Sequence, residues 1–488
     1  MGKNHIITPA CIMVAIILLL FLPGIYRAAS SEADDKYISV PGLIDLRSTF
    51  SDGAHSIEDL VLIARSRGFR AIFVNDHNRI ALSYGLPPFR NILRYKKQFP
   101  SIMTNRPENF IDEIKRLSDK YSDMAIFPGC ETSPYYYWSG SWFSNDLTAN
   151  EYDRRILVLN LNDSDDYGNI PSLHNRMSSK YFKELFPGAL FFLPPLIIGL
   201  FLIRYKRLTR VIGLCLAVFS ILFIADHNPF RSSLFTQYDG DQGITPYQEV
   251  IDYVESKGGL SFWNYPEQRS GKRKHDPIYV NTPPYPQALH QSKGYTGFAA
   301  IYGDNITITD PGGEWDRILT EYCRGQRDDP VWGISTADFH KDGRLGLRLG
   351  AFPTTFLVRE FSKDGILEAI KNGRMYCSRG DGETWPALEY FNVVGEGGRK
   401  AFMGEDLTIK GYPVIRFRVD YIKWESKDIK LYLIRGGKII KTLEGKTPVE
   451  LEYVDKDITP DKKTYYRIID KRKHLTSNPI FVKYLPNG

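Results

Sequence analysis

Residues 42–78 read GLIDLRSTFSDGAHSIEDLVLIARSRGFRAIFVNDHN, and the order of the elements within them sets the architecture expected for much of the chain. A short apolar strand comes first. Ser56, followed three residues later by Asp59, is typical of a capping box that opens a helix. We expect this helix to run to about Arg67 and to stop at Gly68. The segment RAIFVND then predicts a buried strand that ends in polar residues, so the stretch indicates a βα unit.

Five further segments show the same pattern, a short apolar strand followed by a loop or a helix. They are MAIFPG (124–129), RILVLNL (155–161), GGLSFWNY (258–265), YTGFAAIYG (295–303) and VWGIST (331–336). Alternating strands and helices are the pattern of parallel βα units. In barrels built from such units, the active site lies at the carboxyl ends of the strands. The sequence therefore predicts an α/β barrel whose polar strand ends gather at one mouth.

After about Trp385 the pattern changes to alternating strands separated by Gly, Lys and Asp turns. These strands are VIRFRVDYI (414–422), IKLYLIRGG (429–437), KIIKTLEG (438–445), TYYRIID (464–470) and NPIFVKY (478–484). Such a pattern over roughly 100 residues predicts an all-β sandwich. No cluster of His, Cys or Asp stands at its strand ends, so we expect an accessory role.

The N-terminal segment 6–26 is apolar and long enough to cross a membrane as a helix. It is either an uncleaved anchor or a signal peptide. Tyr26 and Arg27 stand where a signal peptidase requires small residues, which favours the anchor.

Two more apolar runs, 185–203 and 211–225, flank the basic sequence RYKRLTR and predict a transmembrane hairpin. Basic loops stay on the cytoplasmic side, so both flanking soluble segments are predicted to be extracytoplasmic. Lys3, before the first apolar segment, predicts the same orientation. Two alternatives stay open. Pro194 and Pro195 interrupt the run at 185–203, so the two runs are also compatible with buried barrel helices or with a re-entrant hairpin.

Composition excludes several classes of function. The 63 basic and 57 acidic residues form no long block of like charge, which argues against a nucleic-acid-binding protein. The five cysteines show no CxxC spacing and imply no disulfide framework. No GxSxG motif, P-loop or dinucleotide-binding GxGxxG motif is present to support serine-hydrolase or nucleotide-dependent chemistry.

Several strand-end motifs resemble, in order, those of the polymerase and histidinol phosphatase (PHP) superfamily. SDG (51–53), NDHN (75–78), PGCE (128–131) and the closing TADFH (336–340) match the family pattern. Other positions depart from it. The family's opening His-x-His is replaced by Asp45 and Arg47, while Arg155 and Asn264 occupy two further His positions. The downstream segments 354–380 and 477–483 are similar to the carbaryl-hydrolase-like branch of the superfamily.

The resemblance implies a distorted TIM-like (PHP) β/α barrel with a metal site at its mouth. The implied metal ligands are Asp45, Asp52, His77, Glu131, Asp338 and His340. The implied catalytic residues are Asp76, Arg47 and Arg155, and the implied substrate-binding residues are Asn264, Arg47 and Arg155. One or two divalent ions are expected. The oxygen-rich donor set suits Mn, Mg or Ca, and the two His residues also allow Zn or Fe.

Two functions follow from these residues. The first is a membrane-anchored, extracytoplasmic metal-dependent hydrolase, most simply a phosphoesterase, in which Arg47 and Arg155 bind a small anionic ester. The second is a catalytically inactive PHP-fold protein that binds a cell-surface ligand, with the same arginines pairing with the carboxylates. The expected organisation is an anchor or signal peptide (1–29), a first barrel part (38–184), a transmembrane hairpin in contact with lipid (185–226), a second barrel part (227–385) and a C-terminal β-sandwich (386–488).

Overall fold

The structure is a computed structural model that describes residues 37–268, 271–304, 306–344, 347–423 and 426–486. The predicted anchor or signal peptide, residues 1–29, lies outside the described residues.

The first βα unit has the predicted form. It consists of β1 (Ile38–Leu46), α2 (Ile57–Ser66) and β2 (Ala71–Val74). The capping box is confirmed, because the Ser56 side chain accepts from the backbone N–H of Asp59 at 3.1 Å, and the Asp59 carboxylate accepts from the N–H of Ser56 at 3.1 Å. Gly68 has a φ of 91°, a left-handed conformation that ends the helix at low steric cost.

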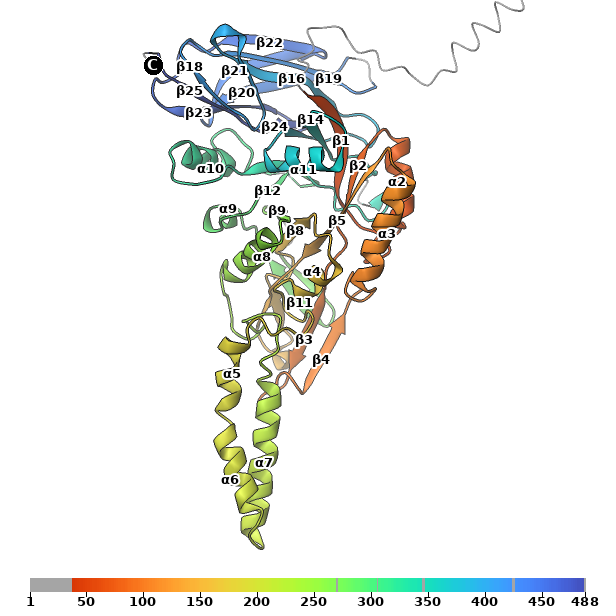
Figure 1. The fold of residues 1–488 in the computed structure, drawn as a ribbon, viewed down its shortest axis with the longest axis vertical. Helices are drawn as coiled ribbons and strands as arrows, with labels where there is room; N and C mark the ends of the chain where they lie inside the picture. Colours follow the sequence, from red (N-terminus) through yellow and green to blue (C-terminus); the bar gives the residue numbers. More distant parts are fainter. Residues whose placement is uncertain (1–36, 269–270, 305, 345–346, 424–425, 487–488) are drawn as a thin grey trace, which may run out of the picture. The chain divides into compact units, whose positions relative to one another are not determined.

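The largest sheet in the described chain curls around an apolar core (Figure 1). Its strands in the barrel part, in sheet order, are β13 (Trp332–Ser335), β12 (Gly297–Ile301), β9 (Leu260–Asn264), β8 (Arg155–Leu159), β5 (Ala125–Thr132), β2, β1, β14 (Pro353–Val358) and β15 (Met375–Ser378). A bridge between Leu46 and Phe339 joins the segment that follows β13 back to β1. The strand ends from β1 to β13 therefore face one another around a mouth.

The prediction of a parallel barrel is wrong for β14, which runs antiparallel to both β1 and β15, and it is also wrong for β8. This strand runs antiparallel to both of its neighbours, β5 and β9. Parallel neighbours need a crossover connection, usually a helix, whereas antiparallel neighbours do not. Here the chain between β5 and β8 contains the short strands β6 (Tyr137–Ser139) and β7 (Thr148–Asn150) and a single 3-10 turn. As a result, β8 presents its first residue, rather than its last, at the mouth.

The helices of the barrel part cover the curled sheet, and two small sheets extend it (Figure 1). The helices are α3 (Pro107–Lys120), α4 (Ser164–Asn169), α8 (Thr245–Ser256), α9 (Ala288–Gln291), α10 (Glu314–Cys323) and α11 (Lys363–Lys371). One small sheet is the hairpin of β3 (Ala81–Gly85) and β4 (Arg94–Gln98), and the other joins β6 and β7 to β10 (Gly271–His275) and β11 (Ile278–Thr282).

The C-terminal part is built from β-strands, as predicted, and two sheets enclose a second apolar core. One sheet contains β16 (Pro386–Val394), β17 (Lys400–Phe402), β19 (Val414–Tyr421) and β22 (Val449–Val454). The other contains β18 (Asp406–Ile409), β20 (Asp428–Arg435), β21 (Lys438–Lys446), β23 (Lys463–Asp470), β24 (Leu475–Ser477) and β25 (Ile480–Tyr484). Because β24 pairs with β15, the second sheet continues the barrel sheet. The boundary at residue 386 therefore stays a prediction.

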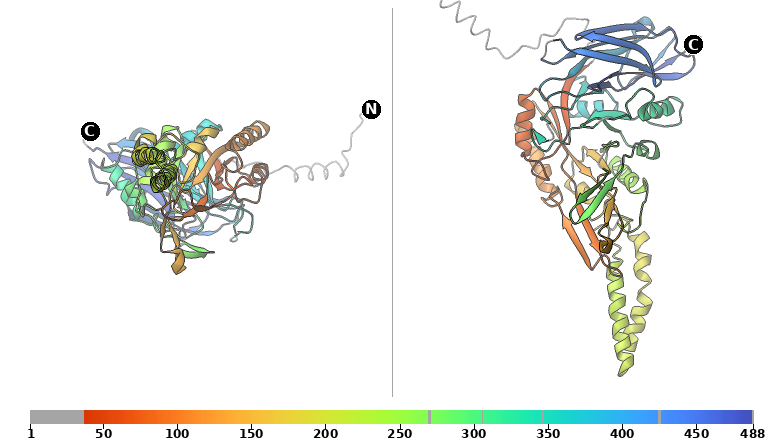
Figure 2. Two further views of the ribbon diagram at one scale, coloured as in Figure 1. Left: turned by 90° about the horizontal axis from the view of Figure 1, so that it is seen from below. Right: turned by 180° about the vertical axis from the view of Figure 1, so that it is seen from behind.

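The hairpin predicted from the two apolar runs consists of α5 (Phe182–Leu190), α6 (Leu193–Leu202) and α7 (Leu208–Asp226). Figures 1 and 2 show α6 and α7 side by side. They approach closely because Gly199 faces Gly213 and Ala217, and a Cβ at position 199 would lie 2.7 Å from the Ala217 nitrogen. Phe182–Leu202 and Leu208–Asp226 are long and apolar enough to cross a membrane.

Candidate metal centre

The strand ends bring most of the predicted site residues together at the mouth of the curled sheet. Asp45 is in β1, Glu131 in β5, Arg155 at the start of β8 and Asn264 at the end of β9. Arg47, Asp76, His77, Asp338 and His340 follow the ends of β1, β2 and β13. Backbone pairing fixes these positions, because His77 forms a bridge with Glu131 and Arg155 pairs with Asn264.

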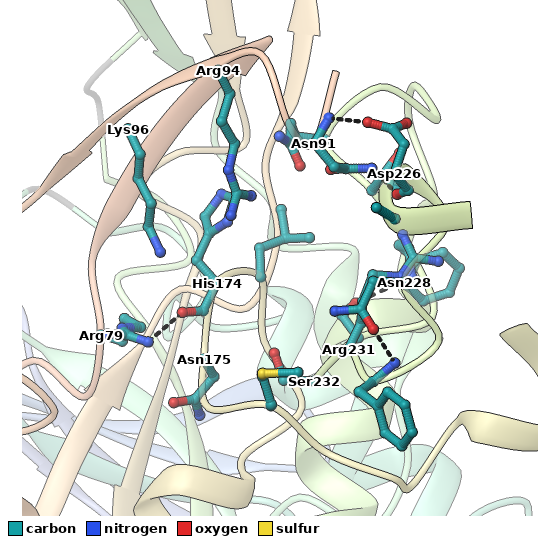
Figure 3. Close-up of a pocket in the computed structure, with 18 residues that line it drawn as sticks. Arg79, Asn91, Arg94, Lys96, His174, Asn175, Asp226, Asn228, Arg231 and Ser232 are labelled. Carbon is teal, nitrogen blue, oxygen red and sulfur yellow. Dashed lines mark hydrogen bonds between the residues drawn. The ribbon is translucent and has the colours of Figure 1, made fainter. Parts of the chain in front are cut away.

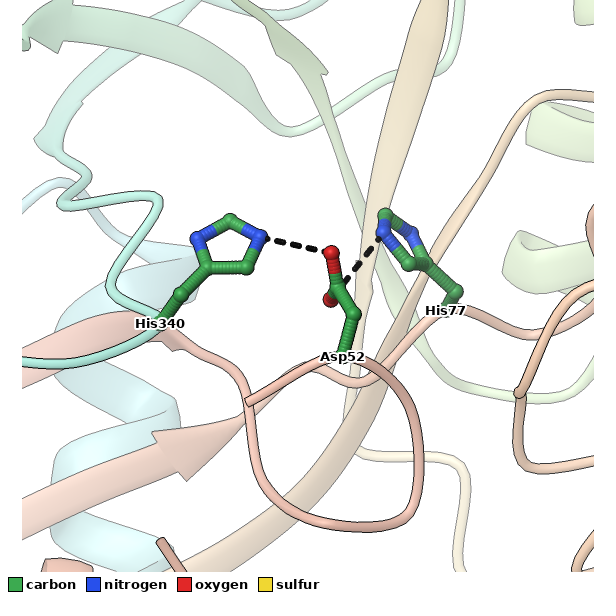
Figure 4. Close-up of side chains that lie close together, drawn as sticks. All are labelled: Asp52, His77 and His340. Carbon is green, nitrogen blue, oxygen red and sulfur yellow. Dashed lines mark ion pairs between the residues drawn. The ribbon is translucent and has the colours of Figure 1, made fainter. Parts of the chain in front are cut away.

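Three of these side chains form a tight cluster: Asp52, His77 and His340 (Figure 4). Oδ2 of Asp52 lies 3.0 Å from Nε2 of His340, and Oδ1 lies 3.5 Å from Nε2 of His77. One candidate ligand atom from each residue lies within 4.8 Å of the other two. The Asp52 side chain is 43% exposed, whereas both imidazoles are nearly buried, so the cluster opens to solvent on the aspartate side.

The loop that carries Asp52 is held by Asp76, which the resemblance implied to be catalytic. Its Oδ1 accepts from the Ser48 N–H at 2.8 Å, its Oδ2 accepts from the Ser48 hydroxyl at 2.5 Å, and it also accepts from the Ser51 hydroxyl. Burial raises the pKa of Asp76, although the bonds from Ser48 and Ser51 act in the opposite direction. Both oxygens of Asp76 are directed at the loop, so its role in the structure is to position Asp52.

Gly53, the last residue of the SDG motif, allows this loop to close tightly. A Cβ at this position would lie 2.2 Å from the carbonyl oxygen of Arg47. The next N–H, that of Ala54, donates to the carbonyl of His340 at 2.8 Å. The loop after β1 and the segment after β13 are thus fixed to each other, which sets the distance between Asp52 and His340.

Each imidazole of the cluster is oriented through its second nitrogen. Nδ1 of His77 lies 3.2 Å from Oε2 of Glu131, and Nδ1 of His340 lies 2.6 Å from the backbone carbonyl of Asp338. With Nδ1 engaged in this way, both rings direct Nε2 towards Asp52. This second set of contacts is the arrangement that metal-binding histidines show in proteins.

Glu131, predicted to be a metal ligand, is instead surrounded by donors. Its Oε2 lies 2.5 Å from Nη1 of Arg155 and 2.8 Å from Nη2 of Arg47. Its Oε1 accepts from the Asn264 amide at 2.8 Å. Burial opposes ionisation, but Arg155 and Arg47 outweigh it and hold the pKa of Glu131 well below its ordinary value. The oxygens of Glu131 are thus engaged by these groups and by His77, and its role as a metal ligand stays a prediction.

Arg47 occupies the interior of the site, with a side chain that is 0% exposed. Its Nη1 lies 2.8 Å from Oδ1 of Asp45, and its Nη2 lies 3.4 Å from Oδ1 of Asp338. Burial opposes its charge, yet Asp45 and Glu131 raise the pKa of Arg47 above its ordinary value. A guanidinium buried among three carboxylates is not accessible to a substrate, so the predicted role of Arg47 in substrate binding does not fit its position.

Arg155 and Asp45 are also engaged by neighbours. Arg155 lies 2.9 Å from Oδ1 of Asp153 in addition to its contact with Glu131, and its side chain is 17% exposed. Asp45 accepts from the Asn264 amide at 3.1 Å and from the Tyr265 hydroxyl, and burial raises its pKa. These contacts place Asp45 outside the three-residue cluster.

The charges of the cluster itself reinforce one another. Burial raises the pKa of Asp52, but the hydrogen bond with His340 and the charge of His77 outweigh this effect and hold it below its ordinary value. Burial lowers the pKa of His340, but the hydrogen bond with Asp52 and the charge of Asp338 reverse this and leave it raised. These interactions favour the charged forms of both Asp52 and His340.

The donor set and spacing fit one transition-metal ion. Protein nitrogens and oxygens lie about 2.0–2.2 Å from such an ion, so adjacent ligand atoms are roughly 3 to 4 Å apart. The Asp52–His340 and Asp52–His77 separations fall in this range. Two imidazoles and one carboxylate suit Zn, Fe or Mn. This set is poorer in oxygen than the predicted one, because Asp45 and Glu131 pair with arginine.

Sequence reasoning missed three residues of the site. Tyr265 donates to Asp45, the Tyr285 hydroxyl donates to the carbonyl of Asn264, and Asp153 pairs with Arg155. Tyr265 and Asp153 flank the predicted strand ends at 264 and 155, so the rule that polar residues gather there would have found them. Tyr285 lies in a loop and carries no such signal.

Neither a protein-family model nor a curated protein matches the sequence. Among solved structures, a two-domain protein from Bacteroides vulgatus containing a predicted PHP-like metal-dependent phosphoesterase shares 13% identity over 89% of this chain and 91% of that chain, with a TM-score of 0.36. A proposed metal-dependent phosphoesterase from Bifidobacterium adolescentis shares 15% identity over 62% and 88% of the two chains, with a TM-score of 0.27.

A third similarity concerns a smaller part of the chain. The fibronectin(III)-like modules of Clostridium thermocellum CbhA share 12% identity over 16% of this chain and 87% of that chain, with a TM-score of 0.12. At these identities and TM-scores, the three similarities do not establish a family for the chain.

Proposed function

We propose that this protein is a membrane-anchored, metal-dependent phosphoesterase that binds one divalent ion through Asp52, His77 and His340. The observation that carries the proposal is the orientation of the two imidazoles. Glu131 and the Asp338 carbonyl engage the Nδ1 atoms, so both Nε2 atoms and the Asp52 carboxylate converge on one point. Metal-binding histidines almost always have the second ring nitrogen engaged by a carboxylate, a backbone carbonyl or a water, and both imidazoles have such a partner here.

Charge balance supports the presence of a divalent cation. The carboxylates at the mouth are Asp45, Asp52, Glu131 and Asp338. Arg47 contacts Asp45, Glu131 and Asp338, and Arg155 contacts Glu131, whereas Asp52 contacts His77 and His340. With neutral imidazoles, four negative charges face two positive ones. A divalent ion bound beside the partly exposed Asp52 would balance the remaining two negative charges.

The residues around this site suit an anionic ester substrate. An ion bound at the cluster would act as a Lewis acid on the phosphoryl group. The side chains of Asp52 and Asp338 are 43% and 37% exposed, and Asp338 is the candidate to accept a proton from an attacking water. Arg155, whose side chain is 17% exposed, is the candidate to contact a phosphate oxygen.

The membrane part of the proposal rests on the exposure of the hairpin. Only 11% and 17% of the residues in the most apolar windows of its two helical segments are buried. Helices of a barrel would bury their apolar side chains, so exposure of this kind favours lipid as the surrounding medium. Alkaline phosphatase fused after Gly488 should be active, and the same enzyme inserted between Lys206 and Arg207 should be inactive. The reverse result would overturn the proposed orientation.

A second function, a catalytically inactive binding module, is favoured by one observation. Arg47 places a fixed positive charge among three carboxylates, which is also what a metal ion would do. If this guanidinium replaces the metal, the fold persists without chemistry.

Metal analysis distinguishes the two functions. The full chain, purified in a neutral detergent, should contain about one equivalent of Zn, Fe or Mn and should hydrolyse p-nitrophenyl phosphate or its bis ester. D52N and H340Q should lose both metal and activity. H55Q is the matched control, because His55 stacks on Phe339 and lies outside the cluster. If the wild-type chain contains no more metal than D52N after incubation with each ion, and shows no turnover, the metal proposal is wrong and the binding module is supported. Bound metal without turnover of either ester would overturn the proposed phosphoesterase activity and leave the metal site standing.

A further inference from the structure

A cavity of about 310 Å³ lies next to the end of the membrane hairpin, apart from the metal cluster (Figure 3). Its walls come from Arg79, from strand β4, from the loop at residues 173–177 and from residues 225–237 at and after the end of α7. Polar and charged side chains dominate this lining. The cavity has no role in the proposed phosphoesterase chemistry.

Four cationic side chains line the cavity: Arg79, Arg94, Lys96 and Arg231. Figure 3 shows Arg94, Lys96 and Arg79 on one side of the space and Arg231 on the other. In the described part of the chain, none of the four forms an ion pair, and the Nε atoms of Arg79 and Arg231 are buried without a hydrogen-bond partner.

The carboxylate in the wall, Asp226, is already engaged. Its Oδ1 accepts from the N–H of Asn91 at 2.7 Å and from that of Ile92 at 3.3 Å. This contact ties the β3–β4 hairpin to the end of α7. Asp226 keeps its negative charge and, with Asp239, acts favourably on Arg231. Four cations and one carboxylate line the cavity, so the lining keeps an excess of positive charge.

The pKa values of two lining residues, Lys96 and His174, reflect this excess of positive charge. Burial, together with Arg79 and Arg94, lowers the pKa of Lys96 to about 8. Burial, together with Lys96 and Arg94, lowers the pKa of His174 to about 3, so its imidazole is neutral. An anion in the cavity would relieve the mutual repulsion of these groups.

The position of the cavity matches the level of lipid headgroups. The tip of the β3–β4 hairpin packs against α7, because Phe89 contacts the rings of Phe219 and Phe223 with centroid distances of 6.1 and 4.8 Å. Beside it, Leu86 and Leu93 are exposed. An exposed apolar tip beside a membrane-spanning helix, with a cationic hollow directly behind it, is the arrangement expected at the boundary between acyl chains and headgroups.

We propose that this cavity binds a phosphate group, carried either by a phospholipid headgroup or by a soluble phosphate ester. Guanidinium groups bind phosphate oxygens through paired hydrogen bonds, and a lysine adds a point charge. Arg94 and Lys96 lie on the same strand, β4, and converge with Arg79 and Arg231 on one volume. The site is independent of the metal cluster, so it holds whether or not the protein is an enzyme.

Binding can be measured on the full chain in a neutral detergent by isothermal titration. The probes are inorganic phosphate, glycerol phosphate, dioctanoyl phosphatidylglycerol and, as a lipid without phosphate, dioctanoylglycerol. The wild-type chain should bind at least one phosphate-bearing probe and should not bind dioctanoylglycerol at this site. R94Q/K96Q should weaken that binding at least about tenfold, because two charge-assisted contacts are lost. Both residues are on a surface strand, so the variant should keep its fold.

The matched control is K115Q/K438Q, which removes two positive charges from exposed positions on α3 and β21. It should bind like the wild type. Preference for phosphatidylglycerol over glycerol phosphate would assign the site to a lipid headgroup, and equal affinity would assign it to a soluble ester. Equal binding by wild type and R94Q/K96Q, or no binding of any phosphate-bearing probe at millimolar concentration, would refute the proposal.

Discussion

Replacing the buried Arg47 tests most directly whether the mouth is assembled as described. R47M keeps much of the side-chain volume but removes the cation that lies 2.8 Å from both Asp45 and Glu131. All three side chains are 0% exposed, so solvent cannot compensate for the loss. Breaking a buried ion pair by removing one partner costs about 3–5 kcal/mol.

This cost can be converted into a shift of the melting temperature. The entropy of unfolding is about 2.1 cal/mol/K per residue, so a compact unit of roughly 450 residues has an unfolding entropy close to 1 kcal/mol/K. R47M should therefore lower the Tm by about 3–5 °C, as measured by tryptophan fluorescence of the full chain in detergent. The double variant R47M/D45N should lose less than the sum of the single variants, because D45N removes one of the uncompensated charges.

R116M is the matched control for this experiment. Arg116 also contacts two carboxylates, those of Glu58 and Glu113, but its side chain is 48% exposed. Exposed ion pairs contribute about 0–1 kcal/mol, so its Tm should fall by less than about 1 °C. If R47M and R116M shift the Tm equally, Arg47 is not buried among the carboxylates, and the geometry of the candidate site is refuted.

Three further predictions concern the cluster and its surroundings. An ion present at 100 times its Kd stabilises the folded chain by about 2.7 kcal/mol, so removing it with a chelator should lower the Tm of the wild type by about 3 °C. The Tm of D52N should not change. An unchanged Tm of the wild type would show that no ion stabilises the fold. G53A should abolish metal binding, because its Cβ would lie 2.2 Å from the carbonyl oxygen of Arg47. G303A should bind metal normally, because a Cβ at Gly303 meets nothing within 4 Å. Equal metal content in the two variants would contradict this account of the loop. Because the folded-state pKa of His174 is lowered to about 3, the contribution of neutral His174 to stability is fully present above its unfolded pKa of about 6.5 and declines as the pH falls towards 3. Between pH 7 and pH 5, in phosphate-free buffer, the free energy of unfolding of the wild type should fall by about 2 kcal/mol more than that of H174Q, and its Tm by about 2 °C more. Parallel pH profiles of the two proteins would show that His174 is not buried beside the cations.

Local sequence patterns determined the elements of the fold. The capping box at Ser56 and Asp59, the glycine stop at Gly68 and the short apolar strands all depend on residues within a few positions of one another. The alternation of strands after Trp385 and the length of the two apolar runs are equally local. Interactions of this kind are encoded in the order of the chain, so these elements could be predicted from it, whereas the small sheets of β3 and β4 and of β6, β7, β10 and β11 were not predicted.

The direction of β8 was decided by tertiary structure. Its apolar pattern is the same whether the strand runs parallel or antiparallel to its neighbours, because side chains alternate with the same period in both cases. Its direction is seen only in its antiparallel pairing with β5 and β9.

The sequence alone determined which residues stand at the strand ends, and therefore which chemistry is available at the mouth. It did not determine how the charges there are paired. Glu131 and Asp45 were predicted to bind metal, yet in the structure they face Arg47 and Arg155. Pairing depends on distances between side chains from strands that are remote in sequence, and electrostatic interactions in a buried site change steeply over a few ångströms. Only the folded arrangement shows that Asp52, His77 and His340 lie within 4.8 Å of one another while Asp45 and Glu131 contact arginine.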